Sequence, residues 1–182
     1  MSATSAPPPA SERAAGVLSL GFLTVLREAN GYLGGYLVVN GWGRPLEFRM
    51  TSAVQPNRVQ QILYGGTLES YICADLIGKT LVDKAGAAAQ LVITDRLEVL
   101  DLRMKLDTPV AWLAPGDGAC GVVAKAPSGG RGAVQCHPRF EIDLEPVRAV
   151  LDRLDSSFDL GEPFLRIREA IGEARKMGVA AR

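Results

Sequence analysis

The sequence predicts a mixed α/β domain, and three observations lead to that fold class. Two Asn-Gly pairs, Asn30-Gly31 and Asn40-Gly41, separate apolar segments near the start of the chain. Such pairs are typical of tight β-hairpins, because both residue types accept a positive φ. Later in the chain, short apolar runs alternate with stretches of helical periodicity. The chain has 182 residues, 47% of them hydrophobic and 22% charged, which suits one domain with a sizeable core.

Composition and charge exclude several classes of protein. Lys plus Arg and Asp plus Glu each number 20, so no net charge attracts nucleic acid or an anionic membrane. No apolar stretch reaches the about 18 residues of a membrane span. The three cysteines do not make a disulfide framework; reduced thiols are typical of a bacterial, cytoplasmic protein. Residues 1–15 are rich in Ser, Ala and Pro and predict a disordered tail, which leaves 16–182 as a single α/β domain.

The first part of the domain is predicted to be a three-strand antiparallel meander. The expected strands cover residues 17–27, 32–39 and 45 to about 54. In the third strand, Leu46, Phe48 and Met50 alternate with polar residues, which indicates one buried and one solvated face. Gly34-Gly35 inside the second strand indicates a bulge or a close approach of the backbone to a neighbour.

Helices and strands alternate in the middle of the chain. A helical turn is expected at 58–64, and a longer helix that is apolar around most of its circumference at 67–86. The apolar runs 90–94 and 109–114 predict buried strands. The segment 96–107 fits both a helix and a strand; we favour a helix, which makes this unit a parallel strand-helix-strand crossover.

The last third of the chain is predicted to contain a hairpin and two C-terminal helices. The Gly- and Pro-rich segment 115–131 is expected to be mobile, with short strands at 121–124 and 133–136. The two helices are expected at about 144–154 and from 161 to about 177, where the second has one apolar stripe.

This order of elements over residues 17–114 resembles the ribonuclease H-like superfamily. Asp95, at the end of a strand, looks like the strand-four acid with which that superfamily holds divalent cations for phosphodiester cleavage. Asp75 corresponds to the acid of the preceding helix, and the resemblance then implies Mg²⁺ as a cofactor. The first strand has no Asp or Glu before Glu28, and Gly21 and Thr24 lie where its metal ligand is expected. The incomplete match indicates a non-catalytic member.

Asp75 and Asp95 are therefore the candidate catalytic and metal-binding residues, with Glu98, Asp101 or Glu47 able to complete the site. Carboxylates bind Mg²⁺ through oxygen, and two-metal phosphoryl chemistry requires more than two of them. The structural alternatives are an ion pair between Asp75 and the lysine one turn later, and an N-cap formed by Asp95. We favour the structural roles.

Aromatic and basic residues near the first hairpins are the candidate binding residues. Tyr32, Trp42 and Arg44 are of the types that protein interfaces favour; the alternative for Trp42 is that it folds back on the sheet or on the C-terminal helices. Cys136-His137 contains the only histidine, and no paired cysteine spacing supports a zinc site. We expect Cys136 to point inward and His137 to lie at the surface.

Three functional hypotheses follow. The leading one is a non-enzymatic protein-binding or assembly module that needs no cofactor and acts through another protein or by self-association. The second is a metal-dependent nuclease or phosphohydrolase of ribonuclease H-like type that uses Asp75 and Asp95. The third is a small-molecule sensor with residues 115–131 as a lid. No phosphate-binding loop or nucleophile elbow is present in the sequence, and the pathway and the partner are not identified.

Overall fold

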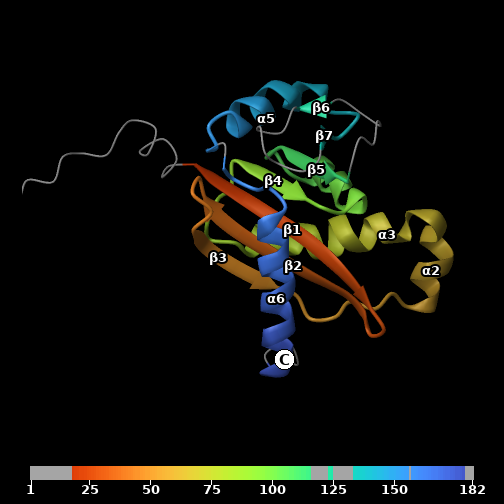
Figure 1. Cartoon of the computed structure of the whole chain (residues 1–182). Helices are drawn as coiled ribbons and strands as arrows, with labels where there is room; N and C mark the ends of the chain where they lie inside the picture. Colours follow the sequence, from red (N-terminus) through yellow and green to blue (C-terminus); the bar gives the residue numbers. More distant parts are fainter. Residues whose placement is uncertain (1–17, 116–122, 125–132, 156, 179–182) are drawn as a thin grey trace, which may run out of the picture.

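The computed structural model describes residues 18–115, 123–124, 133–155 and 157–178, which form a mixed sheet with helices on both faces (Figure 1). The strands are β1 (Ser19–Glu28), β2 (Gly31–Asn40), β3 (Pro45–Met50), β4 (Leu91–Thr94), β5 (Val110–Ala114), β6 (Val123–Ala124) and β7 (Ala133–Cys136). In the described residues they form one sheet in the order β3-β2-β1-β4-β5-β7-β6.

Helical segments join and cover these strands. They are α2 (Arg58–Tyr64), η1 (Gly65–Thr67), α3 (Leu68–Ser70), η2 (Tyr71–Gly78), α4 (Lys79–Lys84), η3 (Leu97–Lys105), η4 (Glu141–Asp143), α5 (Leu144–Leu151) and α6 (Glu162–Lys176). The long apolar helix expected at 67–86 exists as the run from η1 to α4, which ends at Lys84. Its middle part, η2, is a π-helix, with wider turns than an α-helix.

The predicted fold class is confirmed. β1 pairs antiparallel with β2, and β2 with β3; β4 is parallel to β1 and β5 is parallel to β4. These directions give the antiparallel meander and the parallel crossover that the sequence predicts. The segment 96–107 is helical, as we favoured, in the form of the 3₁₀ helix η3. The third strand is shorter than predicted and ends at Met50.

Adjacent glycines in β2 explain how both helical layers approach the sheet closely. A Cβ atom on Gly34 would lie 2.1 Å from Cγ2 of Ile77 in η2, and one on Gly35 would lie 2.3 Å from Cγ2 of Ile167 in α6. Side chains of consecutive strand residues point to opposite faces, so each glycine makes room for one layer. The close approach predicted for this pair is confirmed.

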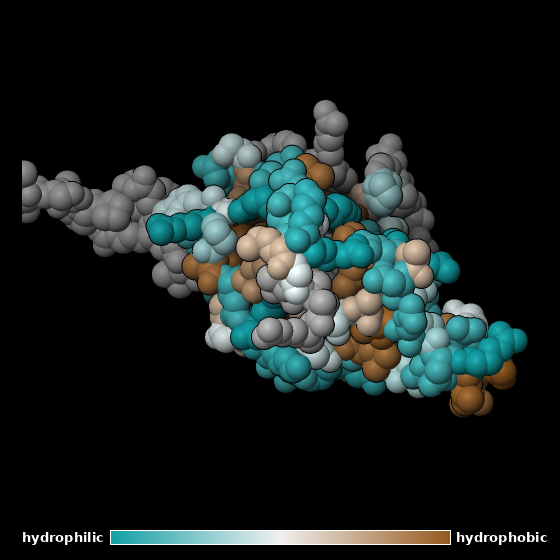
Figure 2. All heavy atoms as spheres, turned by 90° about the horizontal axis from the view of Figure 1, so that it is seen from below, coloured by the Kyte–Doolittle hydropathy of each residue, from teal (hydrophilic) through white to brown (hydrophobic). Residues whose placement is uncertain are grey.

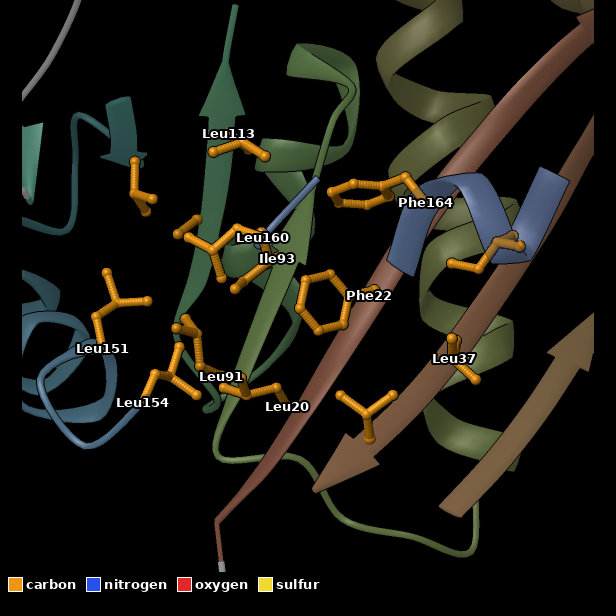
Figure 3. Packing of buried hydrophobic residues seen from close by; sticks show 14 of the residues in the cluster. Leu20, Phe22, Leu37, Leu91, Ile93, Leu113, Leu151, Leu154, Leu160 and Phe164 are labelled. Atoms are coloured by element: carbon orange, nitrogen blue, oxygen red, sulfur yellow. The ribbon is translucent and has the colours of Figure 1, made fainter. Parts of the chain in front are cut away.

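The core consists of two apolar layers, one on each face of the sheet. One layer packs between the sheet and α5 and α6, and Figure 3 shows its centre around Phe22, Ile93 and Phe164. The other packs between the sheet and the segments η2, α4 and η3. In β3 the expected buried face is largely exposed, with Leu46 and Phe48 open to solvent, because β3 is an edge strand and α6 contacts β1 and β2 instead.

Some predicted features lie outside the described residues. These are the tail at 1–15 and most of the lid segment 115–131, of which only 115 and 123–124 are described. Among the described residues, none of the helices has the length and apolarity that crossing a membrane requires.

Candidate functional site

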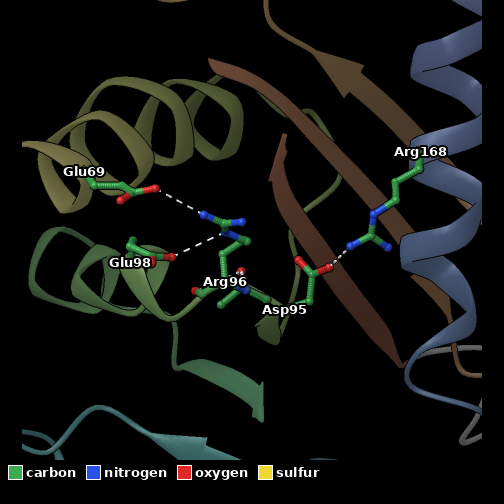
Figure 4. A network of polar contacts seen from close by, with 6 residues as sticks. Glu69, Asp95, Arg96, Glu98 and Arg168 are labelled. Atoms are coloured by element: carbon green, nitrogen blue, oxygen red, sulfur yellow. Dashed lines mark hydrogen bonds and ion pairs between the residues drawn. The ribbon is translucent and has the colours of Figure 1, made fainter. Parts of the chain in front are cut away.

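Asp95 lies at the carboxyl end of β4, where the register of the parallel strands places it beside Thr24 of β1. Leu23 pairs with Thr94, so the next residues of the two strands are neighbours and face α6. The Oδ2 atom of Asp95 accepts a hydrogen bond from the guanidinium of Arg168 in α6 (Figure 4). Oδ1 of Asp95 and Oγ1 of Thr24 are buried and have no hydrogen-bond partner among the residues that the structure describes. These two unsatisfied polar atoms lie at one point of the sheet.

The next residue, Arg96, extends to the other side of the sheet. Its guanidinium lies 3.2 Å from a carboxylate oxygen of Glu69 in α3 and 3.3 Å from one of Glu98 in η3, as Figure 4 shows. Glu69 was not singled out from the sequence, because it lies 27 positions before its partner. The carboxylates around this end of the sheet are therefore each held by an arginine.

Asp75 is not brought together with Asp95. It lies in η2 and lines a separate hollow of about 210 Å³ together with Tyr64, Tyr71 and Asp101. The ion pair considered with Lys79 does not form; Lys79 bonds to Asp83 instead. The physical reason is the π-helix, in which a residue four positions later no longer lies directly above the first.

The N-cap considered for Asp95 is also absent. The N-cap position of η3 is Arg96, and no side chain bonds to the first turn. The carboxylate of Asp95 instead faces α6, where Arg168 binds it.

The three acids considered as completing a metal site are dispersed. Glu98 pairs with Arg96, and Asp101 lies 3.3 Å from Nε2 of His137. Glu47, in β3, accepts a hydrogen bond of 2.7 Å from the backbone N–H of Ala87, which holds the pKa of its carboxyl below the usual value. In the described part of the chain, His, Cys, Asp and Glu form no group of three or more that is able to hold a metal. These residues do not fit a two-metal centre.

The described cysteines are buried and unreactive. Burial raises the pKa of Cys73 to about 12 and that of Cys136 to about 11, so neither supplies a thiolate nucleophile near neutral pH. His137 is buried against Phe140, contrary to the surface position expected for it. Its Nδ1 accepts a hydrogen bond from the backbone of Arg139, which turns the ring inward.

The candidate binding residues lie at opposite ends of β2. Tyr32 is buried near the start of β2, and the guanidinium of Arg27 lies 5.7 Å from the centre of its ring. Trp42 and Arg44 follow the other end of this ten-residue strand, in the turn before β3. Their backbone N–H groups both donate to the side chain of Asn40, which fixes the turn. Trp42 is 54% exposed, so it does not fold back on the sheet.

Trp42 lines a hollow on the surface of the protein, and we call this site the Trp42 hollow. It has a volume of about 540 Å³. Its lining comes from the β2–β3 turn, from the loop between α5 and α6, and from α6: Gly41, Trp42, Gly43, Asp155, Ser157, Phe158, Asp159, Glu162 and Arg166. More than a hundred residues of chain separate the β2–β3 turn from the other lining residues, so no local pattern in the sequence joins them.

Direct bonds hold the walls of the Trp42 hollow in place. Arg166 donates to the backbone oxygen of Gly43 at 2.8 Å and pairs with Glu162, which ties α6 to the turn. The ring of Phe158 stacks on that of Phe22 at 6.3 Å and anchors the loop to the core. Gly43 has a φ of +77°, a conformation that glycine adopts without strain.

Acidic side chains outnumber basic ones in the lining of the Trp42 hollow. Asp155 accepts hydrogen bonds from the hydroxyl and the backbone of Ser157, which lower the pKa of its carboxyl. Asp159 accepts one from the backbone of Gly161. In the described part of the chain neither acid forms an ion pair, and Arg166 is engaged by Glu162. An exposed indole beside two unpaired carboxylates favours a cationic ligand.

No family model and no curated protein matches this chain. Several solved structures resemble it. Endonuclease V from Bacillus subtilis has a TM-score of 0.49 and 9% identity, over 90% of this chain and 84% of that one. Endonuclease V from Ciona intestinalis, in complex with inosine-containing DNA, has a TM-score of 0.37 and 9% identity, over 57% and 47%. Argonaute from Marinitoga piezophila, with guide RNA, has a TM-score of 0.31 and 11% identity, over 55% and 16%.

Proposed function

We propose that this protein is a non-catalytic binding module on a ribonuclease H-like scaffold, and that it takes a basic segment of a partner protein in the Trp42 hollow. The observation that carries the proposal is the exposed indole of Trp42 beside Asp155 and Asp159, two carboxylates without an ion-pair partner among the described residues. An Arg or Lys side chain of the partner stacks on the indole and pairs with these acids.

The energetics of such a contact are favourable. A guanidinium over the face of an indole contributes about 0.5–2 kcal/mol, depending on how far it is desolvated. Trp and Arg are the residues that most often dominate binding energy at interfaces. The hollow also needs little rearrangement on binding, because Arg166 and Phe158 already hold its walls; a prearranged site avoids part of the ordering cost.

The non-catalytic part of the proposal is supported by the arginines at the end of the sheet. Arg168 binds Asp95, and Arg96 binds both Glu69 and Glu98. In this arrangement guanidinium groups neutralise the carboxylates that a divalent cation requires.

Titration with an oligo-arginine peptide, followed by the indole N–H signals in NMR spectra, tests the binding proposal. We expect the Trp42 signal to shift in a saturable way. The Trp112 signal should stay in place, since that side chain packs in the core layer on the opposite face of the sheet. Trp42→Ala should weaken binding by about tenfold or more.

Controls separate a specific site from general electrostatic attraction. An oligo-glutamate peptide of the same length should give no shift, and Asp159→Asn should weaken binding of the arginine peptide. Asp83→Asn removes an exposed acid that pairs with Lys79 and should leave binding unchanged. The proposal is wrong if saturating arginine peptide leaves the Trp42 signal in place, or if Trp42→Ala binds as tightly as the wild type.

Metal-dependent phosphodiester hydrolysis is a second candidate, favoured by one observation. At the carboxyl ends of β4 and β1, Asp95 and Thr24 each have a buried oxygen that no described residue hydrogen-bonds. Arg168 is the residue that would have to leave for a cation to reach them. The dispersed acids described above do not supply further carboxylate ligands, so we derive no catalytic step.

Thermal unfolding with Mg²⁺ or Mn²⁺ distinguishes the two candidates. A cation that binds only the native state adds about 2.7 kcal/mol at a hundredfold excess over its Kd, or roughly 5–10 °C in Tm. We expect no such rise for the wild type. A rise in Tm that Asp95→Asn abolishes and Asp83→Asn preserves would support the metal-dependent candidate, and nuclease assays would follow. The small-molecule sensor stays a prediction, because most of its lid segment lies outside the described residues.

A further inference from the structure

The helix α2 presents an apolar surface that no described residue covers. Val59, Ile62 and Leu63 are 63%, 66% and 75% exposed, and α2 has no buried residue. At spacings of three and four positions these side chains share one face. We call them the α2 ridge. Figure 1 shows α2 at the edge of the molecule, and Figure 2 shows hydrophobic side chains gathered at that end.

This helix is held in place although it has no core of its own. The side chain of Asn57 accepts a hydrogen bond from the backbone N–H of Gln60, and the side chain of Gln60 accepts one from the backbone N–H of Asn57, which is a capping box. At the other end, the ring of Tyr64 stacks on that of Tyr71 in η2, with centroids 4.0 Å apart. A seven-residue helix is too short to be stable by itself, so these contacts position the ridge.

A hollow lined by apolar side chains lies beside the α2 ridge. We call it the Tyr64 hollow; it is the site of about 210 Å³ that Asp75 lines, with Tyr64, Tyr71 and Met104 as its largest apolar side chains. This volume is sufficient for the side chain of one leucine. Tyr64 belongs both to α2 and to the wall of the hollow, so ridge and hollow share one surface.

The charges of the ridge and the hollow are complementary. Arg58 is the only charged residue of α2, and its guanidinium contacts the side chain of Gln61 in the same helix. The Tyr64 hollow carries Asp75, Asp101 and Lys105. Asp75 forms no ion pair within the described part of the chain. A second α2 that enters the hollow brings its arginine towards this acid.

We propose that two copies of this chain associate through an exchange of these features: the α2 ridge of each copy packs into the Tyr64 hollow of the other. In an isologous two-fold contact both copies use the same surface, and every interaction occurs twice. Such a contact requires that the ridge and the hollow lie next to each other on each copy. In this arrangement Leu63 of each copy fills the apolar part of the partner copy's hollow, and Arg58 pairs with Asp75. The contact is small, so the dimer is weak and exchanges with monomer.

Analytical ultracentrifugation of the full chain over a concentration series tests this proposal. The wild type should shift from monomer to dimer as concentration rises. Leu63→Glu should raise the dimer Kd by about tenfold or more, without loss of fold, because its side chain has no core contact. Leu165→Glu, at a 59% exposed leucine of α6, is the matched control and should dimerise as the wild type does.

Swapping the charges of Arg58 and Asp75 gives a second test. A general loss of apolar surface would not produce the changes in dimer affinity that are expected from it. Arg58→Glu and Asp75→Arg should each weaken the dimer, and the double variant should restore part of the lost affinity. The proposal is overturned if the wild type stays monomeric at every concentration, if Leu165→Glu disrupts the dimer and Leu63→Glu does not, or if the double variant is weaker than both single variants.

Discussion

Replacing Asp143 with alanine is expected to lower the free energy of unfolding by about 3–5 kcal/mol. Asp143 ends η4, and its carboxylate binds the guanidinium of Arg103 through two hydrogen bonds, of 2.6 and 3.1 Å. The side chain of Asp143 is 5% exposed and that of Arg103 is 13% exposed. Loss of the acid leaves a nearly buried cation without its counter-charge, and that desolvation cost is the reason for the large effect.

Urea unfolding followed by circular dichroism measures this effect. Asp83→Ala is the matched control, since it removes an exposed ion pair with Lys79, and its expected cost is within about 0.5 kcal/mol. The double variant Arg103→Met with Asp143→Leu should be less destabilised than Asp143→Ala, because no unpaired charge remains. A loss below about 1 kcal/mol for Asp143→Ala would contradict the buried pair as described.

Replacing Phe164 with alanine is expected to cost about 3–5 kcal/mol and to lower the Tm by about 10 °C. Phe164 is buried at the start of α6, and its ring meets that of Phe22 edge to face at 5.4 Å. This contact fixes α6 on the sheet at the point where Figure 3 shows the two rings together. The deleted ring leaves a cavity between the helix and β1.

Chemical unfolding of Phe164→Ala and of Leu165→Ala gives the comparison. The second variant makes a similar truncation one residue later, on an exposed side chain, and should change the free energy of unfolding by less than about 0.5 kcal/mol. Combining Phe164→Ala with Phe22→Ala should reveal a coupling of about 0.5–1.5 kcal/mol. Equal stability of the two single variants would mean that α6 is not anchored through this ring.

The position of α6 also connects the two sites of this protein. On one flank Arg166 holds the β2–β3 turn and forms a wall of the Trp42 hollow. On the other flank Arg168 binds Asp95. Because Phe164 precedes both arginines by less than two turns, its loss should weaken arginine-peptide binding as well as stability. A loss of both stability and peptide binding indicates that α6 has moved, whereas a substitution of Trp42 is expected to weaken binding alone.

Local patterns in the sequence were sufficient for most of the elements, for the antiparallel meander and for the parallel crossover. The Asn-Gly pairs placed the first two hairpins, because turn chemistry belongs to a few adjacent residues and needs no distant partner; the positive φ values at these turns are those of Gly31 and Gly43. Gly34 and Gly35 indicated a close approach because a strand residue without a side chain leaves room for a neighbour, and the structure has this approach on both faces. The helical state of 96–107 was predicted, but its 3₁₀ form was not.

Partners that are far apart in the sequence were decided by tertiary structure alone. Arg168 binds Asp95 across 73 positions, Arg103 binds Asp143 across 40, and Arg166 reaches Gly43 across 123. A charged side chain has the same local pattern whether it faces solvent or a partner, so no spacing rule identifies such pairs. The π-helix had the same consequence for Asp75, because its wider turns moved Lys79 out of reach.

The sequence by itself determined the fold class, the meander, the parallel crossover and the turn that carries Trp42, because these follow from hydrophobic period and from turn chemistry. The tertiary structure decided which acids are neutralised, which residues join Trp42 around its hollow, and that the α2 ridge lies beside the Tyr64 hollow. The physical reason is that function here depends on side chains from separate elements, and their distances are set only when helices pack on the sheet.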